Sequence, residues 1–373
     1  MTIPEPTIPE PTTPEPTIPE PGTPGASPRS AATAPPAPSP KVPPATAPRV
    51  RITPRVGSAG SRITGLGHFR PDGVITNDDL SRIMDTDDEW IRSRVGIAER
   101  RFAGEDDSVV SMGARAGAKA LAEAGLHPTD IDTIIVATCS LNSPVPHAST
   151  QIAGALGIHA PGSFDINAAC AGFCYGLAAA DQAVRLGASK NVLVVGSERL
   201  TDWTDPTDRA TAIIFADGAG AAVVSASDAQ TIGPVVWGCD ESNIEAIRID
   251  GRNGYFFQEG QTVFRWATTS IAPVAIAAAA AAGVALADID VLVTHQANLR
   301  IIDAIAKKVI AAGARPDLKV ARDIITSGNT SSASIPIALD RMRAAGEVTS
   351  GQVVLSVAFG AGLTYAGQVF LCP

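Results

Sequence analysis

The stretch DINAACAGFCYGLAAADQAVRLG, residues 165–187, joins the end of an apolar strand to a long, Ala-rich helix. At the junction stands Cys170, and its neighbours are the small residues Ala168, Ala169, Ala171 and Gly172. A thiol at a helix N-terminus lies near unpaired N–H groups and the positive end of the helix dipole, which stabilise a thiolate. The small neighbours leave room for a substrate. This stretch therefore predicts a nucleophilic cysteine with a lowered pKa.

The other four cysteines are Cys139, Cys174, Cys239 and Cys372. None of the five forms a CxxC pair of the kind that binds metals, so no metal and no other cofactor is expected. Because cysteine often serves as a small buried apolar residue, we expect these four to be buried. An odd number of unpaired cysteines is also typical of reduced thiols in the cytoplasm.

Outward from the opening stretch, apolar runs typical of buried strands alternate with helical patterns. In the first half, strands are predicted over 133–140, 191–198 and 220–227, and helices over 108–126, 149–157 and 170–187. In the second half, helices are predicted over 264–283, 299–312 and 334–346, and strands over 291–298, 352–360 and 363–371. This alternation predicts an α/β fold with two similar lobes, residues 57–229 and 230–373.

Residues 1–56 differ in composition from the rest of the chain. Of the 29 prolines, 18 lie in the first 55 residues, many of them in the repeat TIPEPTIPEPTTPEPTIPEP (2–21). Proline at this density removes backbone donors and favours polyproline II, so a disordered, solvated tail is expected.

Charge and hydropathy argue against nucleic acids and membranes as partners of this chain. A net charge of −9 argues against a general nucleic-acid binder, since phosphate binding requires clustered cations. The most apolar run, from about Ile271 to Ala287, is mostly alanine, contains Pro273 and is shorter than a bilayer span. We expect it to form a core helix, with no membrane insertion.

Two polar motifs in the second half accompany the cysteine. His295 follows the apolar run VLVT, and Asn329 lies in the turn SGNTSSASIP (327–336) before a helix. Strand ends are where α/β folds tend to deliver functional groups. Taken singly, His295 is explained equally well as a structural histidine, and Asn329 as a residue that caps the following helix.

Taken together, several motifs resemble the 3-oxoacyl-[acyl-carrier-protein] synthase III family: AACAGF, GSERLTDWTDPTDRATAIIFADGAGAA, HQANLRII, GNTSSAS and the terminal AFGAGLTYAGQVFL. The resemblance covers about residues 60–373 and implies a thiolase-like fold, with two α/β lobes in a five-layer αβαβα arrangement. It implies transfer of an acyl group from acyl-CoA to Cys170, followed by decarboxylative Claisen condensation with malonyl-acyl-carrier protein. The product, a 3-oxoacyl-carrier protein, would initiate fatty acid or polyketide synthesis. A homodimer is also implied.

The resemblance assigns roles to individual residues. His295 and Asn329 would hold the enolate oxygen, while the N–H groups of Cys170 and Ala361 would form an oxyanion hole. The residues implied in CoA binding are Trp90, Arg94, Arg209, Gly260, Phe264, Ala297 and Asn298. Those implied in carrier-protein binding are Arg265, Arg300, Lys307 and Lys308. Val145 would close the acyl pocket across the dimer interface; because acetyl-restricted members carry phenylalanine there, longer primers are expected.

Three other functions compete with this interpretation. A papain-like protease uses Cys, His and Asn in the same chain order, but no C-G-S-C-W type signature surrounds Cys170. A thiolase-fold acyltransferase of secondary metabolism would pass the acyl group on without decarboxylation; the presence of both His295 and Asn329 disfavours it, because only decarboxylation needs the pair. A non-catalytic partner would be expected to lack Cys170.

Overall fold

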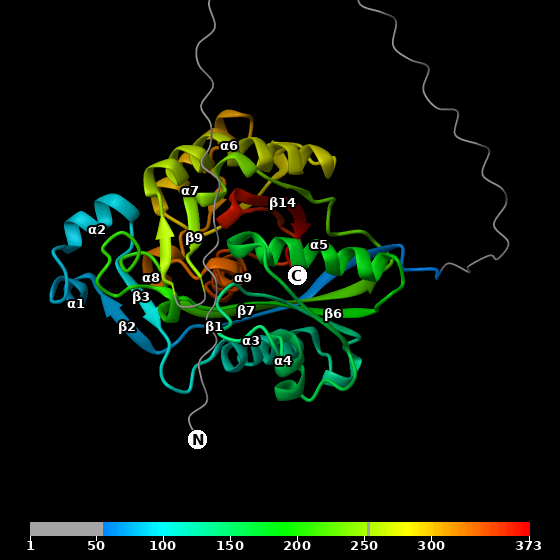
Figure 1. Cartoon of the computed structure of the whole chain (residues 1–373). Helices are drawn as coiled ribbons and strands as arrows, with labels where there is room; N and C mark the ends of the chain where they lie inside the picture. The colour runs from blue at the N-terminus through cyan, green and yellow to red at the C-terminus, as the bar shows by residue number, and fades with distance from the viewer. Residues whose placement is uncertain (1–54, 252–253) are drawn as a thin grey trace, which may run out of the picture. The chain divides into compact units, whose positions relative to one another are not determined.

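The structure, a computed structural model, describes residues 55–251 and 254–373. Two five-stranded sheets dominate this part of the chain, with helices between them and outside them (Figure 1). The tail predicted over residues 1–56 lies almost entirely outside the described residues and stays a prediction.

The first sheet is built from the apolar runs of the first half. Its strands, in spatial order, are β1 (Gly60–Phe69), β7 (Asp217–Ser227), β6 (Asn191–Arg199), β4 (Thr133–Ala137) and β5 (Gly162–Ile166). β7 is antiparallel to both β1 and β6, whereas β6, β4 and β5 are parallel. Strands β4 and β6 are covered on both faces, which explains their continuous apolar sequence.

The second sheet repeats this arrangement. Its strands, in spatial order, are β8 (Val236–Cys239), β14 (Thr364–Leu371), β13 (Val353–Phe359), β11 (Val291–Thr294) and β12 (Lys319–Val320). Here β14 is antiparallel to β8 and β13, while β13, β11 and β12 are parallel. The predicted similarity of the two halves therefore extends to strand order and direction. The boundary predicted at 229/230 lies between β7 and β8.

Helices form three layers around the two sheets (Figure 1). The outer face of the first sheet is covered by α3 (Val109–Ala124) and α4 (Ala148–Leu156). Between the sheets lie α5 (Gly172–Arg185) and α9 (Ser334–Ala344). The outer face of the second sheet is covered by α6 (Gly260–Ala281) and α7 (Leu299–Ala311). The five-layer αβαβα architecture predicted from the resemblance is confirmed.

Helix α6 contains much of the Ala-rich run. It is the one helix in 55–251 and 254–373 that is long and apolar enough to cross a bilayer. Its residues Ile271, Ala275 and Ala278 are fully buried and pack with Leu355 and Val369 of the second sheet. This packing confirms the prediction of a core helix.

Among the described residues, seven shorter elements surround the region where the two sheets meet, and none of them was predicted. They are β2 (Gly73–Thr76), α1 (Asn77–Ser81), α2 (Asp88–Val95), β3 (Glu99–Phe102), β9 (Ile247–Ile249), β10 (Phe256–Gln258) and α8 (Ile324–Ser327). Leu80 of α1, Ile91 of α2 and Ile324 of α8 join three of these elements in one apolar cluster. These segments supply much of the wall of the cavity described next.

Candidate active site

A cavity of about 600 Å³ lies where strand ends of the two sheets converge. Thirteen of the sixteen predicted site residues line it: Trp90, Arg94, Cys170, Arg209, Gly260, Phe264, Arg265, His295, Ala297, Asn298, Arg300, Asn329 and Ala361. The structure thus brings together residues that are up to 271 positions apart in the sequence, counted from Trp90 to Ala361. Val145, Lys307 and Lys308 lie outside this cavity.

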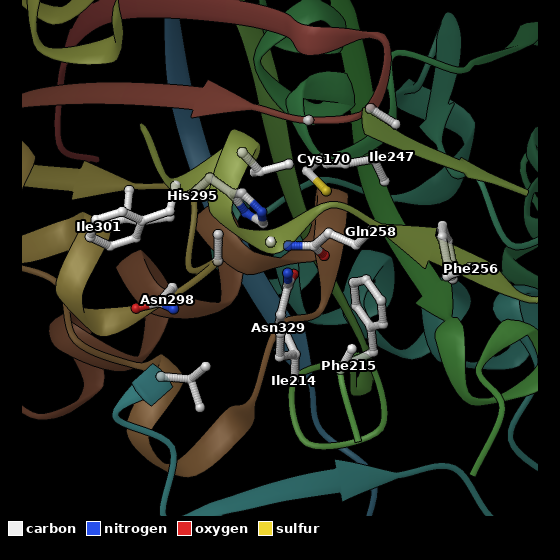
Figure 2. Close-up of a pocket in the computed structure, with 18 of the residues that line it drawn as sticks. Cys170, Ile214, Phe215, Ile247, Phe256, Gln258, His295, Asn298, Ile301 and Asn329 are labelled. Atoms are coloured by element: carbon white, nitrogen blue, oxygen red, sulfur yellow. The ribbon is translucent and has the colours of Figure 1, made fainter. Parts of the chain in front are cut away.

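Cys170 lies in a 3-10 turn, Ala169–Ala171, between β5 and α5. Ala169 has φ 45°, a left-handed conformation that is strained for a residue with a β-carbon. Strain of this kind persists where the surrounding structure enforces it, and it often marks functional sites. The sharp turn presents the sulfur to the cavity (Figure 2).

The electrostatics of Cys170 differ from the prediction. The pKa of the thiol is raised to about 12, mainly by burial and partly by the negative charge of Glu198, although a hydrogen bond with the Ser331 hydroxyl acts to lower it. The predicted lowering of this pKa is wrong, because desolvation outweighs the donors at the helix end. In the free enzyme the nucleophile is therefore a neutral thiol.

His295 directly follows β11. Its backbone N–H donates to the Val357 carbonyl at 2.9 Å, and its Nδ1 lies 2.8 Å from Ser334 Oγ. The ring packs edge-on against Phe359, with centroids 5.3 Å apart. Burial lowers the pKa of His295 to about 3, so the imidazole is neutral at physiological pH. A neutral imidazole can donate a hydrogen bond from one ring nitrogen only.

Asn329 is fixed by three hydrogen bonds at the end of the first sheet. Its N–H donates to the Ile214 carbonyl, and its carbonyl accepts from the Ala216 N–H, both at 2.9 Å. Its side-chain Oδ1 accepts from the Ser331 N–H at 2.9 Å. This last bond orients the amide and leaves Nδ2 as a donor toward the cavity, on the side of Cys170 and His295 (Figure 2).

The backbone of Gly360 packs against that of Cys170. A β-carbon on Gly360 would lie only 2.6 Å from Cys170 N, so this close approach requires glycine. Ala361, the next residue, also lines the cavity. Within the described part of the chain, the N–H groups of Cys170 and Ala361 donate to no other residue. Two backbone donors are therefore available beside the sulfur.

Aromatic rings and cations form the mouth of the cavity. The central guanidinium carbons of Arg94 and Arg209 lie 5.3 and 4.6 Å from the centroid of the Trp90 ring. Arg300 lies 5.0 Å from the centroid of Phe264. A mouth with this chemistry suits a ligand that carries both phosphates and a flat base.

Asn298 links two sides of this mouth. Its Oδ1 accepts from the Arg300 N–H at 2.9 Å and caps α7, while its Nδ2 donates to the Arg94 carbonyl at 3.2 Å. The three residues outside the cavity have other surroundings. Val145 is 73% exposed, Lys307 borders a second hollow beside α7, and Lys308 Nζ donates to the Thr268 carbonyl.

The cysteines other than Cys170 follow the prediction in part. Cys174 and Cys372 are buried, as expected. The expectation is wrong for Cys239, which is exposed on the edge strand β8. It is also wrong for Cys139, which is only half-buried because it lines the cavity, with its sulfur 3.6 Å from Ser331 Oγ.

Sequence reasoning missed four residues around the reacting groups. Ser331 and Ser334 lie within GNTSSAS, and their fixed spacing from Asn329 was the available signal. Glu198 is buried at the end of β6, where it accepts from the hydroxyls of Thr138, Ser140 and Ser332. Gln258 lies on β10, in a segment for which no element was predicted, and no sequence pattern distinguished it.

No group of three or more His, Cys, Asp or Glu side chains in residues 55–251 and 254–373 is arranged to hold a metal ion.

Comparison with known proteins identifies the family. A family model described as 3-oxoacyl-[acyl-carrier-protein (ACP)] synthase III matches residues 164–241, and the model of its C-terminal part matches residues 279–372. A beta-ketoacyl-[acyl-carrier-protein] synthase III of Streptomyces coelicolor is 48% identical over 317 residues, which cover 84% of this chain and 99% of that protein. The chain belongs to the 3-oxoacyl-[acyl-carrier-protein] synthase III family. A mycobacterial synthase III of Mycobacterium avium is 42% identical over 87% of this chain and 99% of its own length.

Solved structures agree with this membership. The priming beta-ketosynthase of the R1128 polyketide biosynthetic pathway superposes with a TM-score of 0.83, at 41% identity over 87% of this chain and 99% of that one. The synthase III of Aquifex aeolicus gives a TM-score of 0.80, at 38% identity over 84% of this chain and 100% of that one. The predicted family, thiolase-like fold and condensing acyltransferase class are confirmed, and a papain-like protease is excluded.

Proposed function

We propose that this synthase III condenses an acyl group, taken from acyl-CoA, with malonyl-acyl-carrier protein to give a 3-oxoacyl-carrier protein. One observation carries the proposal: Cys170 after β5, His295 after β11 and Asn329 after α8 converge in a single cavity. The product is the first elongated chain of fatty acid or polyketide synthesis.

Acylation of Cys170 is the first half-reaction. The sulfur forms a bond to the thioester carbon of acyl-CoA, the carbon–sulfur bond to CoA breaks, and the thiol proton leaves with the CoA sulfur. The negative charge that develops on the carbonyl oxygen is stabilised by fixed donors. The free N–H groups of Cys170 and Ala361 are suited to this role. Since the pKa of the thiol is about 12, its proton is lost only as the acyl group arrives.

Decarboxylation and condensation form the second half-reaction. The carbon–carbon bond to the malonyl carboxylate breaks, CO2 leaves, and the electron pair forms an enolate on the malonyl thioester. Its oxygen accepts from the neutral imidazole of His295 and from Nδ2 of Asn329, in a site shielded from water. The enolate carbon then bonds to the acyl carbon, and the sulfur of Cys170 leaves as the thiolate.

The mouth of the cavity would bind CoA and the carrier protein in turn. Trp90 would stack on adenine, with Arg94 close by; Arg209 already stacks on Trp90, so the adenine must displace it or insert beside it. Gly260, Phe264, Ala297 and Asn298 would contact the pantetheine chain. An acidic carrier protein would be steered by the local cations Arg265, Arg300, Lys307 and Lys308 on an otherwise acidic molecule.

The proposed enzyme is a homodimer in the cytoplasm that uses no cofactor and does not insert into a membrane. Strand β5 forms an open edge of the first sheet and exposes Phe164, whose side chain is 44% accessible. An open edge with an exposed aromatic residue is suited to pairing with a second copy. In such a dimer, Val145 of the partner subunit would close the acyl pocket.

The test is incubation with malonyl-carrier protein and a panel of acyl-CoAs, with mass spectrometry of enzyme and carrier. The expected result is acylated Cys170, released CO2 and a 3-oxoacyl-carrier protein. The other thiolase-fold activity, acyl transfer without decarboxylation, would instead give an acyl-carrier protein with no CO2. That outcome would overturn the proposal.

A further inference from the structure

Gln258 reaches into the active-site cavity from the hairpin β9–β10. It pairs with Ile247 in the antiparallel register, and both residues line the cavity. The neighbouring Phe257 faces solvent, where Arg248 stacks 4.1 Å from its centroid. Alternation along the strand therefore turns Gln258 inward. Figure 2 shows its amide pointing toward His295 and Asn329.

Three other side-chain amides of the described chain line the cavity, those of Gln261, Asn298 and Asn329, and the amide of Gln258 differs from the last two. Asn329 and Asn298 are each held by a backbone N–H, from Ser331 and Arg300 respectively. The Gln258 side chain is half-buried, and within 55–251 and 254–373 it makes no hydrogen bond to another residue.

The wall around Gln258 is apolar. Phe256 lies two residues earlier on the same strand and packs on Phe215 with ring centroids 4.8 Å apart, and Ile247 lies opposite. A ligand that displaces water from this amide must replace the lost hydrogen bonds, or binding is weakened. An alkyl primer offers no group that could do so.

The reacting groups narrow the choice of ligand. The thioester oxygen of the acyl group is assigned to the N–H groups of Cys170 and Ala361, and that of the malonyl group to His295 and Asn329. Among the groups at the reacting ends of the two substrates, as distinct from their pantetheine arms, the malonyl carboxylate is the polar group that remains unassigned. At the mouth of the cavity, the guanidinium groups of Arg209 and Arg300 stack on the rings of Trp90 and Phe264, respectively.

We propose, resting on the function proposed above, that Nε2 of Gln258 donates to the carboxylate of the malonyl extender. Gln258 is then a third side-chain donor of the second half-reaction. It orients the carboxylate for departure as CO2. A cation would strongly stabilise the carboxylate in the ground state and would therefore oppose the loss of its charge as CO2 departs. A neutral amide can orient the carboxylate without this penalty.

The test compares Gln258→Met, which keeps the length and removes the donor, with Gln258→Glu, which adds a negative charge. Phe257→Leu, one residue away on the solvent face, is the matched control. Two rates are measured for each variant: self-acylation by acyl-CoA alone, and CO2 release by pre-acylated enzyme at varied malonyl-carrier protein. Since a hydrogen bond to a charged group is lost, Gln258→Met should lower kcat/KM for the extender ~10-fold or more. Gln258→Glu should lower it further, and self-acylation should stay within about twofold.

The outcomes separate this inference from the proposed function. Equal losses in both half-reactions, a loss confined to self-acylation, or no loss at all would each overturn the role of Gln258. Wild-type enzyme that releases no CO2 would instead overturn the proposed function. A change in the Phe257→Leu control equal to that in Gln258→Met would assign the effect to the hairpin and overturn the inference as well.

Discussion

The turns after β5 and β12 occupy equivalent places in the two halves of the molecule. Each leads from a parallel strand toward a helix of the central layer, α5 or α9. Each also contains a residue with a β-carbon at positive φ, Ala169 at 45° and Ser331 at 48°. The first turn carries Cys170 and the second carries Asn329. The backbone is repeated, whereas the chemistry is not.

The strands β4 and β11 are a second equivalent pair. Beyond β4 lies Cys139, a thiol near the Glu198 carboxylate, and after β11 comes His295, a neutral imidazole next to Ser334. The first half thus supplies the nucleophile and the second half supplies neutral donors. This difference teaches that a duplicated fold can place the nucleophile in one half and the enolate donors in the other, and the following predictions are designed to break or sharpen that division.

The largest effect is expected from Cys170→Ser. Without the thiol, no covalent acyl adduct should form with acyl-CoA, and condensation should be lost with it. Intact-protein mass spectrometry checks this. The matched control is Cys174→Ser in the same segment, whose sulfur is buried in the core between the sheets and should not affect the adduct. An adduct that maps to Cys174 or Cys139 would contradict the assignment.

Asn329→Ala and His295→Ala should affect the other half-reaction. Removal of one donor to a developing oxyanion typically costs about 10²–10³ in rate, so CO2 release should fall by that factor in each variant. Self-acylation of Cys170 is the internal control and should change little in the Asn329 variant. If both half-reactions fall equally in Asn329→Ala, the division between the halves is wrong.

The reactivity of the Cys170 thiol, in the first half of the chain, and the CO2 release assisted by His295, in the second half, should depend differently on pH. Because burial raises the pKa of Cys170 to about 12, its thiolate fraction should increase roughly tenfold per pH unit between about pH 6 and 9. Alkylation by iodoacetamide, corrected with Cys170→Ser, should follow that slope. The pKa of His295 is lowered to about 3, so CO2 release by acylated enzyme should be nearly flat over the same range. An alkylation plateau near neutral pH would indicate a thiol of low pKa instead.

The smallest effect is expected from Val145→Phe, which tests whether a second copy contributes to the acyl pocket. Each buried methylene is worth roughly 0.8 kcal/mol, so loss of space for two or three should shift the preference toward acetyl-CoA. The kcat/KM ratio of butyryl-CoA to acetyl-CoA measures this. Val56→Phe, at a position that is 96% exposed, is the control and should leave the ratio unchanged. An unchanged ratio in Val145→Phe would remove Val145 from the pocket.

Much of the fold could be predicted because its elements have strong local patterns. The capping serine Ser108 and the terminal Gly125 delimit α3 almost as expected, and β4 and β6 are continuous apolar runs. Strands β9 and β10 are three residues each and were missed, since so short a segment carries too little periodicity.

The sequence by itself determined where three candidate groups lie: Cys170 before a helix, His295 after a strand and Asn329 in a turn. Each placement depends on a few neighbouring residues, so local patterns predict it, whereas the roles of His295 and Asn329 were predicted from the family resemblance. It also determined that the chain contains two α/β halves, because the alternation of apolar runs and helical patterns is itself local.

Only the tertiary structure decided the charge state of these groups and the polar residues around them. The raised pKa of Cys170 comes from burial, and its partner Ser331 is supplied by the other half of the chain. Gln258 becomes part of the cavity through a hairpin far from Cys170 in the sequence. Desolvation and contact depend on what surrounds a group in space, and segments distant in sequence provide those surroundings.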